Sequence, residues 1–227
     1  MQRNREAASV TRMTDPLQAV SVKAVLFDYG RVLSGPEKVE SWIDMRDLLG
    51  LSEEKFRELY WKYRDDYDRG TLSGTQYWSN IARDVAFPLL DDSLVELKKL
   101  DVEMWTELNP PMLEWAHRLK SAGIRIGILS NIGDAMEQGI RAKFAWVEGF
   151  THATWSHTLK MRKPEREIYA AAAKGLGVEP GEILFIDDRE DNIAGAQAAG
   201  MRGVVYALHN EFEQEMERLG LGALLRV

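Results

Sequence analysis

The hydrophobic positions of the chain gather into short segments of two kinds. One kind is a nearly continuous apolar run rich in β-forming residues, which is typical of a strand buried in a parallel sheet. Such runs occupy residues 22–28, 124–129, 183–186 and 203–206, with a weaker one near 150–154. The other kind has the spacing of a helix and fills residues 111–121, 133–142, 165–175 and 190–199. This alternation predicts an α/β fold, with a Rossmann-like three-layer α/β/α arrangement around a parallel sheet.

The interval from about residue 36 to residue 106 has a different pattern, because it contains no strand-like run. It predicts helices near 37–49, 53–68, 75–86 and 92–106. Ser52 and Thr75 follow breaks in the pattern and are predicted to cap two of these helices. A helical stretch inserted after the first strand predicts a cap. We therefore expect an α/β core made of residues 22–35 and 107–227, interrupted by a helical cap at 36–106.

The first 21 residues are polar and include three arginines, but they contain no apolar stretch suited to a signal peptide. They are predicted to form a disordered extension. A mitochondrial-type transit peptide is one alternative, and initiation at Met13 is another.

Charge and composition limit the possible chemistry. The 227-residue chain carries 36 Asp and Glu against 29 Lys and Arg, a formal net charge of −7, and it contains no cysteine. The missing cysteine excludes disulfides, thiolate zinc sites and cysteine nucleophiles. The negative balance argues against nucleic acid and acidic membranes as partners, and no apolar run approaches the roughly 18 residues that would span a bilayer. We expect a cytoplasmic protein that acts on a small molecule, and the oligomeric state is left open.

Polar residues stand where the predicted strands end. Asp28 ends the first run, Ser130-Asn131 follow the second, and Asp187-Asp188 follow the run at 183–186. Lys163 stands just before the helix predicted at 165–175. Each residue taken alone is more often part of a turn or a helix cap than of a site. Ligands of open α/β sheets bind beyond the carboxyl ends of the strands, so their joint occurrence there points to chemistry.

This set of side chains suits phosphoryl transfer. Carboxylates gathered at one sheet edge repel one another unless a cation lies between them, and an all-oxygen set suits Mg²⁺. An adjacent carboxylate oxygen can then attack phosphorus and form an aspartyl phosphate. A lysine and backbone N–H groups can neutralise the phosphoryl oxygens.

The same segments, in the same order, resemble the four motifs of the haloacid dehalogenase superfamily. The matching segments are residues 27–33, 128–131, 163–164 and 185–192, and the resemblance covers about residues 22–207. Residues 161–169, together with Asp187-Asp188 and Asn192, are similar to one branch of that superfamily. It holds bacterial α-D-glucose-1-phosphate phosphatases and the N-terminal phosphatase domain of soluble epoxide hydrolases. The resemblance implies the superfamily's fold with a helical cap of the type inserted after the first motif.

The resemblance also implies roles in handling the phosphoryl group. Asp28 would be the nucleophile. Ser130, the backbone of Asn131 and Lys163 would bind the phosphoryl group.

A second group of roles concerns Mg²⁺. Asp28, the backbone carbonyl of Gly30 and Asp188 would hold the ion. Asp187 would contact the ion through a water molecule or would hold one of its ligands. Asn192 would orient Asp188 or a metal-bound water.

The chain departs from the superfamily pattern at Gly30, where most of its phosphatases have a second aspartate. That aspartate acts as a general acid and base, a contribution of typically about 10²–10⁴-fold. The glucose-1-phosphate phosphatase branch shares the glycine. We therefore predict a bias toward anomeric sugar, aryl and acyl phosphates, whose leaving groups depart without strong protonation. Arg31, which stands where glycine is usual, either contacts the substrate or faces solvent.

The tryptophans and histidines of the chain are predicted to have structural rather than catalytic roles. Trp42, Trp61 and Trp78 are predicted to pack the cap helices, and the four histidines have no metal-ligand spacing. Tyr67 or Asp68, beside the turn at 69–71, is a candidate for substrate contact.

We expect a Mg²⁺-dependent phosphatase of small phosphorylated metabolites, with a sugar 1-phosphate as the favoured substrate. Two alternatives remain. One is a 2-haloacid dehalogenase, in which Asp28 displaces halide from carbon without a metal. The other is a catalytically inactive binding or regulatory protein, for which Gly30 would be a sign of decay.

Overall fold

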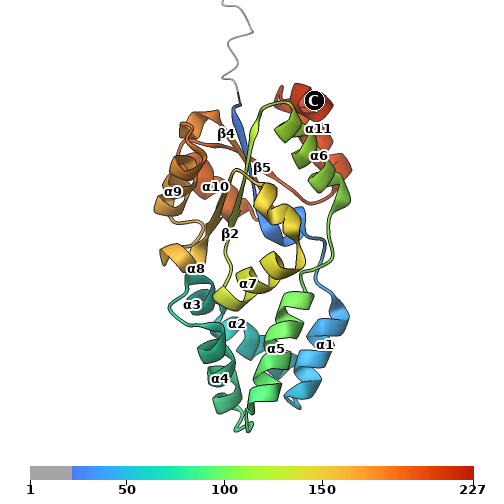
Figure 1. Cartoon of the computed structure of the whole chain (residues 1–227), viewed down its shortest axis with the longest axis vertical. Coiled ribbons are helices and arrows are strands. Elements are labelled where there is room, and N and C mark those ends of the chain that lie inside the picture. Colours follow the sequence, from blue (N-terminus) through green and yellow to red (C-terminus); the bar gives the residue numbers. More distant parts are fainter. Residues whose placement is uncertain (1–21) are drawn as a thin grey trace, which may run out of the picture.

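The fold is built on one sheet of five parallel strands (Figure 1). The structure is a computed structural model that describes residues 22–227, so the extension predicted at 1–21 lies outside the described residues. The strands stand in the order β3-β2-β1-β4-β5. Their bounds are β1 (Ala24–Phe27), β2 (Arg125–Ser130), β3 (His152–Trp155), β4 (Ile183–Asp187) and β5 (Arg202–Val205). The predicted α/β fold with a parallel sheet is confirmed.

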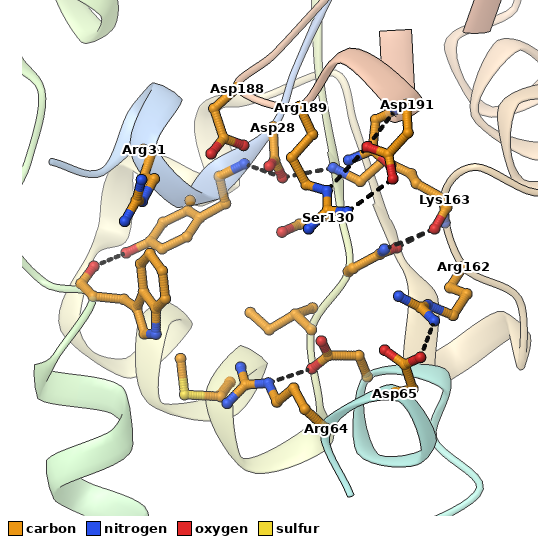
Figure 2. Close-up of a pocket in the computed structure, with 18 of the residues that line it drawn as sticks. Asp28, Arg31, Arg64, Asp65, Ser130, Arg162, Lys163, Asp188, Arg189 and Asp191 are labelled. Atoms are coloured by element: carbon orange, nitrogen blue, oxygen red, sulfur yellow. Dashed lines mark hydrogen bonds and ion pairs between the residues drawn. The ribbon is translucent and has the colours of Figure 1, made fainter. Parts of the chain in front are cut away.

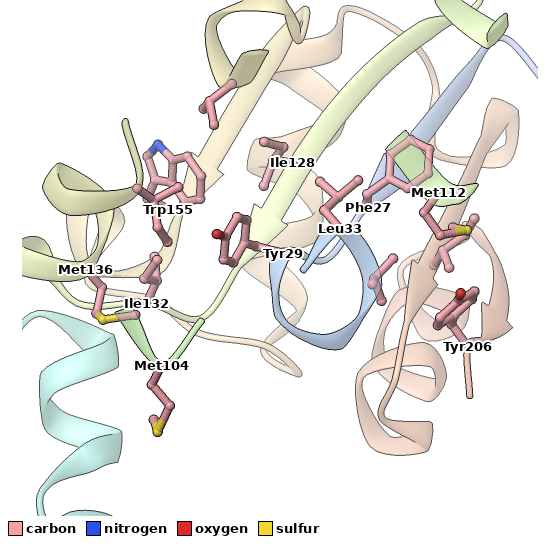
Figure 3. Packing of buried hydrophobic residues seen from close by; sticks show 14 of the residues in the cluster. Phe27, Tyr29, Leu33, Met104, Met112, Ile128, Ile132, Met136, Trp155 and Tyr206 are labelled. Atoms are coloured by element: carbon pink, nitrogen blue, oxygen red, sulfur yellow. The ribbon is translucent and has the colours of Figure 1, made fainter. Parts of the chain in front are cut away.

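Helices cover both faces of this sheet because successive residues of each buried strand point to opposite sides. Ala24 and Leu26 of β1 belong to the core cluster that α9 (Arg166–Leu176) and α10 (Glu190–Ala198) complete. Val25 and Phe27 belong to the opposite cluster, and Figure 3 shows Phe27 there together with Leu33 and Met112. Phe27 packs edge-on against Trp115. Trp115 lies on α6 (Pro110–Ser121), which covers this second face together with α11 (His209–Arg218).

The chain between β1 and α6 is helical. We call its helices α1 (Val39–Leu48), α2 (Glu53–Lys62), α3 (Arg64–Arg69), α4 (Gly74–Asp84) and α5 (Asp91–Glu103) the cap helices. They lie beyond one end of the sheet (Figure 1). The connections into and out of them run side by side, joined by an antiparallel bridge between Ser34 and Leu108 and by the bond from Gly35 N to Glu107 O (2.7 Å). The division of the chain into domains at residues 36 and 106 stays a prediction.

Local details differ from the predicted elements. The helix predicted over 53–68 is two helices, because Tyr63 leaves the helical region with φ −109° and ψ 1°. Ser73, rather than Thr75, caps α4, because the Ser73 hydroxyl and the Gln76 side chain bind each other's backbone N–H groups in a capping box. Thr75 lies within the first turn of that helix. Helix α11 has no counterpart among the predicted helices.

The cap helices approach the core closely at two glycines. Gly133 precedes α7 (Asp134–Lys143), and a Cβ added to it would lie 2.1 Å from the ring of Tyr67. Gly70 ends α3 with φ +76°, and a Cβ there would lie 2.4 Å from the carbonyl oxygen of His157 in α8 (Ser156–Leu159). Larger side chains at these positions would push the cap helices away from the core.

Four short helical turns complete the chain. They are η1 (Tyr29–Leu33), η2 (Ala145–Gly149), η3 (Pro180–Glu182) and η4 (Gly222–Arg226). Within residues 22–227, every helix is too short or too polar to cross a membrane.

Candidate active site

A cavity of about 530 Å³ lies between the carboxyl ends of the central strands and the cap helices. Figure 2 shows Asp28 and Asp188 on one side of it, with Arg64 and Asp65 on the other. The core side comes from the ends of β2, β1 and β4, which are neighbours in the sheet. Parallel strands thus bring residues more than 150 positions apart in the chain to one edge.

Asp28 follows β1 directly, and one of its two oxygens is bound on two sides. Oδ1 accepts the N–H of Tyr29 at 2.7 Å and pairs with the ammonium group of Lys163 at 2.8 Å. Among the described residues, no donor binds Oδ2. Burial raises the pKa of Asp28 to about 7 against the opposing charge of Lys163, and the charges of Asp187 and Asp188 add to the rise. One oxygen of the Asp28 side chain is therefore held in place, and the other is free of protein donors in the described part of the chain.

Lys163 connects two of the carboxylates. Its side chain is only 1% exposed, and Nζ lies 2.8 Å from Asp28 Oδ1 and 2.7 Å from Asp187 Oδ2. Burial alone would lower the pKa of Lys163, but the charges of Asp187 and Asp28 outweigh it and raise the pKa. The lysine therefore stays protonated and keeps two buried negative charges close together.

Asn131 fixes the backbone from which Lys163 extends. Its side-chain oxygen accepts the N–H of Lys163 at 2.8 Å, and its side-chain nitrogen donates to the carbonyl of Lys163 at 3.0 Å. Ser130, the last residue of β2, is buried next to it and lines the same cavity. Asn131, directly after β2, thus fixes the backbone of Lys163 next to the centre of the sheet.

Asp187 is fully buried, and donors occupy both of its oxygens. Oδ1 accepts the side chain of Asn192 and the N–H of Arg189, both at 2.9 Å, while Oδ2 faces Lys163. The amide of Asn192 thus holds Asp187, whereas the sequence predicted that it orients Asp188 or a metal-bound water. The difference arises because Asp187 points inward at the end of β4, toward the first turn of α10, while Asp188 is half-buried and lines the cavity.

The carboxylates fit a hard divalent cation. Asp28, Asp187 and Asp188 each offer an oxygen within 4.8 Å of the others, and Lys163 is the one buried cation of the described residues that pairs with them. Burial, together with the charge of Asp187, raises the pKa of Asp188 as well. Three carboxylates against one lysine leave negative charge uncompensated, and an all-oxygen donor set of this kind suits Mg²⁺.

A model of the haloacid dehalogenase-like hydrolases matches residues 22–200 of the chain. The chain belongs to this family. Its relatives carry out different reactions. Phosphatase MT3486 of Mycobacterium tuberculosis (strain CDC 1551 / Oshkosh) is 27% identical over 217 residues, which cover 91% of this chain and 98% of that protein. (S)-2-haloacid dehalogenase 4A of Burkholderia cepacia is 28% identical over 193 residues, 81% of this chain and 82% of that protein.

Two further comparisons extend the list, one with a longer protein and one with a solved structure. Bifunctional epoxide hydrolase 2 of Sus scrofa is 25% identical over 88% of this chain, but the match spans only 39% of that longer protein. The HAD family enzyme bt-2542 of Bacteroides thetaiotaomicron, solved in complex with magnesium and inorganic phosphate, superposes with a TM-score of 0.69. It is 23% identical, with 85% of this chain and 100% of that chain covered, and so shares the fold.

The structure of this haloacid dehalogenase-like hydrolase places Gly30 beside an aromatic ring. A Cβ added to Gly30 would lie 3.5 Å from the indole of Trp105, so this ring borders the space in which a side chain would begin. Trp105 lines the cavity, and its buried indole N–H has no partner among the described residues. Where most phosphatases of the superfamily are expected to have an acid, this hydrolase has an apolar surface.

Arg31 lines the cavity but is already paired. Its guanidinium binds Glu37 through both carboxylate oxygens at 2.7 Å, and its side chain is about half exposed. Its backbone has a φ of 58°, a region that favours glycine, which explains why glycine is usual there. Contact with the substrate stays a prediction.

The cap side of the cavity includes residues that the sequence did not single out. Trp61 is 53% exposed and lines the cavity, so the prediction that it packs the cap helices is wrong, whereas Trp78 is fully buried. Asp68 also lines the cavity, while Tyr67 is buried behind it. The missed cap residues are Arg64, Asp65 and Trp105, and Arg162 of the core segment before α9 lies beside Asp65. Charged helix residues such as Arg64 are ordinarily solvent-exposed, and its spacing from Asp68 is the one sequence signal that points to a pair.

Proposed function

We propose that this hydrolase is a Mg²⁺-dependent phosphatase of a small phosphorylated metabolite and that it acts through an aspartyl phosphate on Asp28. The observation that carries the proposal is the asymmetric environment of Asp28. Lys163 and the N–H of Tyr29 hold Oδ1, while Oδ2 has no protein partner among residues 22–227. A carboxylate oriented in this way has one oxygen available for in-line attack on phosphorus. The relationship to a mycobacterial phosphatase supports the same reaction class.

The residues around Asp28 divide the remaining tasks. Mg²⁺, held by Asp28, Asp188 and the carbonyl of Gly30, would supply neutralising charge for the phosphoryl oxygens. Lys163 adds a fixed positive charge on the opposite side of Asp28, and Ser130 with the backbone of Asn131 would donate hydrogen bonds to the phosphoryl group. Asp187 and Asn192 keep Lys163 in position. Water entering the cavity would then hydrolyse the aspartyl phosphate.

Gly30 and Trp105 bear on which substrates react. Without an acid at position 30, the leaving group departs unassisted, so esters with good leaving groups are expected to react faster. Anomeric sugar phosphates meet this requirement, and a sugar 1-phosphate is our proposed substrate. As part of this proposal, we assign the chain to the branch of glucose-1-phosphate phosphatases and epoxide hydrolase phosphatase domains.

A second candidate function is dehalogenation of a 2-haloacid. It is favoured by the 28% identity to (S)-2-haloacid dehalogenase 4A, which is as high as the identity to the phosphatase. Asp28 would then displace halide from carbon. The cluster of three carboxylates argues for the phosphatase. The attack of Asp28 on carbon needs no metal ion, so it does not require the uncompensated negative charge that Asp188 adds.

One set of assays separates the candidates. Purified protein is supplied with p-nitrophenyl phosphate, a panel of sugar phosphates and a 2-haloacid, each with and without Mg²⁺, and Asp28→Asn is measured in parallel. We expect Mg²⁺-dependent phosphate release that Asp28→Asn abolishes. Chloride release without phosphate release would establish the dehalogenase. Faster hydrolysis of glycerol phosphate than of sugar 1-phosphates would contradict the proposed effect of Gly30.

A further inference from the structure

The cap side of the cavity holds a buried ion pair opposite the carboxylates. Arg64 and Asp68 lie four residues apart on α3, so their side chains meet on one side of the helix. Both line the cavity, with side chains only 8% and 12% exposed. Figure 2 shows Arg64 across the cavity from Asp28 and Asp188. A charged pair in this position faces the part of a substrate that lies beyond its phosphoryl group.

Each partner keeps one polar atom free. Arg64 donates through Nε to Asp68 Oδ1 at 2.9 Å, and through Nη1 to Tyr60 Oη at 2.5 Å and Asp101 Oδ1 at 3.3 Å. Within residues 22–227, neither Arg64 Nη2 nor Asp68 Oδ2 has a hydrogen-bond partner. Neither atom is among the fully buried side-chain atoms without a partner, so both keep some accessible surface, and both residues line the cavity. The pair therefore presents one donor and one acceptor side by side.

The surroundings hold this pair in place. The guanidinium of Arg64 lies over the rings of Tyr60 and Tyr67, 5.2 and 5.4 Å from their centres. The backbone carbonyl of Asp68 accepts the hydroxyl of Ser156 at 2.5 Å, which ties this end of α3 to the core. A donor and an acceptor whose positions are fixed before binding select a ligand with little loss of conformational entropy.

The charges around the pair indicate what it binds. Among the residues that line this side, Arg64 pairs with Asp68 and Arg162 pairs with Asp65, so the charges of the lining are balanced. Burial raises the pKa of Asp68 to about 6, against the opposing charge of Arg64, so Asp68 is mostly ionised at neutral pH. A second charged group on the substrate, of either sign, would have to compete with one of these ion pairs. An uncharged group that both accepts and donates satisfies the two free atoms, and a hydroxyl does so.

We propose that Arg64 and Asp68 form a specificity subsite for an uncharged, hydroxyl-bearing leaving group, such as a sugar or another polyol. The proposal rests on the phosphatase function, because it assigns the non-phosphoryl part of that substrate. A hydroxyl would accept from Arg64 Nη2 and donate to Asp68 Oδ2. The exposed face of Trp61 and the indole of Trp105 line the same cavity and offer the aromatic surfaces on which sugar rings pack.

The first test compares substrates on the wild-type protein. A panel of phosphate esters that differ in the distal group is assayed with Mg²⁺, including sugar 1-phosphates, phosphoethanolamine and phosphoglycolate. We expect the sugar phosphates to have the highest kcat/KM. A preference for phosphoglycolate or for phosphoethanolamine would overturn the subsite while leaving the phosphatase function intact. Hydrolysis of none of these esters or of p-nitrophenyl phosphate would instead overturn the proposed function.

The second test removes one charge. In Asp68→Asn, the ratio of kcat/KM for glucose 1-phosphate to that for phenyl phosphate is expected to fall about 10- to 100-fold, mainly through KM. This is the size of losing one hydrogen bond to a charged group. Asp66→Asn is the matched control, because Asp66 is exposed on the same helix and lies outside the cavity lining. An unchanged ratio, or an equal loss for both esters, would contradict the proposal.

A binding measurement covers the case in which turnover is too slow to compare. Thermal unfolding is followed with increasing methyl glucoside, which carries the hydroxyls but no phosphate. We expect the wild-type protein and Asp66→Asn to be stabilised and Asp68→Asn to lose that stabilisation. Equal stabilisation of all three proteins, or of none, would overturn the subsite.

Discussion

The two sides of the cavity both bury charge, but they balance it differently. On the core side, three carboxylates share one lysine, and burial raises the pKa of both Asp28 and Asp188. On the cap side, the lining carboxylates are paired with arginines, Asp68 with Arg64 and Asp65 with Arg162 of the core segment before α9. The first arrangement lacks positive charge, which a bound divalent cation would supply for phosphoryl transfer. The second is already paired and suits recognition of an uncharged group.

The largest expected effect in this comparison comes from removing the lysine of the core side. Lys163→Met leaves Asp28 and Asp187 buried without a cation, so we expect a loss of about 3–5 kcal/mol in the free energy of unfolding. Turnover should fall by about 10²–10³-fold. Urea denaturation and steady-state kinetics measure both effects. Lys174→Met, an exposed lysine on α9, serves as the control. Stability equal to that of the wild-type protein would show that the carboxylates do not depend on Lys163.

A change of about tenfold per pH unit is expected in the apparent affinity for Mg²⁺, because protons compete with the metal for the carboxylates of the core side. The pKa of Asp28 is raised from 3.8 to about 7, so ionising this group disfavours the fold of the metal-free protein as pH rises through about 7. Mg²⁺ needs the ionised form, so its apparent affinity should weaken about tenfold for each pH unit below about 7. Thermal unfolding with and without Mg²⁺ at about pH 6 and 8 measures this change. An equal stabilisation by Mg²⁺ at both pH values, in the wild-type protein, would contradict the assignment.

The smallest effect is expected at the exposed ion pair of the cap side. Asp65 pairs with Arg162 at 2.6 Å, but its side chain is 74% exposed. Exposed pairs contribute about 0–1 kcal/mol, so Asp65→Asn should change the free energy of unfolding by less than about 1 kcal/mol and kcat/KM by about threefold or less. The same assays as for Asp68→Asn apply. A larger loss in Asp65→Asn than in Asp68→Asn would move the specificity subsite from the buried pair to the cavity rim.

The difference between the two sides also explains what the sequence could reveal. The core-side residues stand directly after apolar runs of the sequence. The runs predict the parallel sheet, and its strand ends bring these residues together, so both could be predicted; they are Asp28, Ser130, Asp187 and Asp188. The hydrogen bond from Asn192 to Asp187 could not, because it depends on which of two adjacent aspartates points inward. Neighbouring residues at a strand end alternate in direction, and a shift of one residue reverses them.

The cap side offered a weaker signal, because the sequence pointed to Asp68 or Tyr67 beside the turn at 69–71 but not to Arg64. Arg64 and Asp68 have the spacing of an ordinary surface ion pair on a helix, and only the break at Tyr63 and the packing of α3 on α8 place them inside the cavity. Trp105 likewise lies beyond the last cap helix in sequence but beside Gly30 in space. Contacts of this kind depend on tertiary packing. The sequence therefore predicts the class of reaction better than it predicts the substrate.

The central claim is that Asp28 carries the phosphoryl group during turnover. The most direct measurement mixes enzyme, Mg²⁺ and substrate, stops the reaction with acid within milliseconds, and locates the modified peptide by mass spectrometry. We expect a phosphoryl group on the peptide that contains Asp28, with none in Asp28→Asn. A phosphoryl group on another residue, or multiple turnovers without any modified enzyme, would contradict the account.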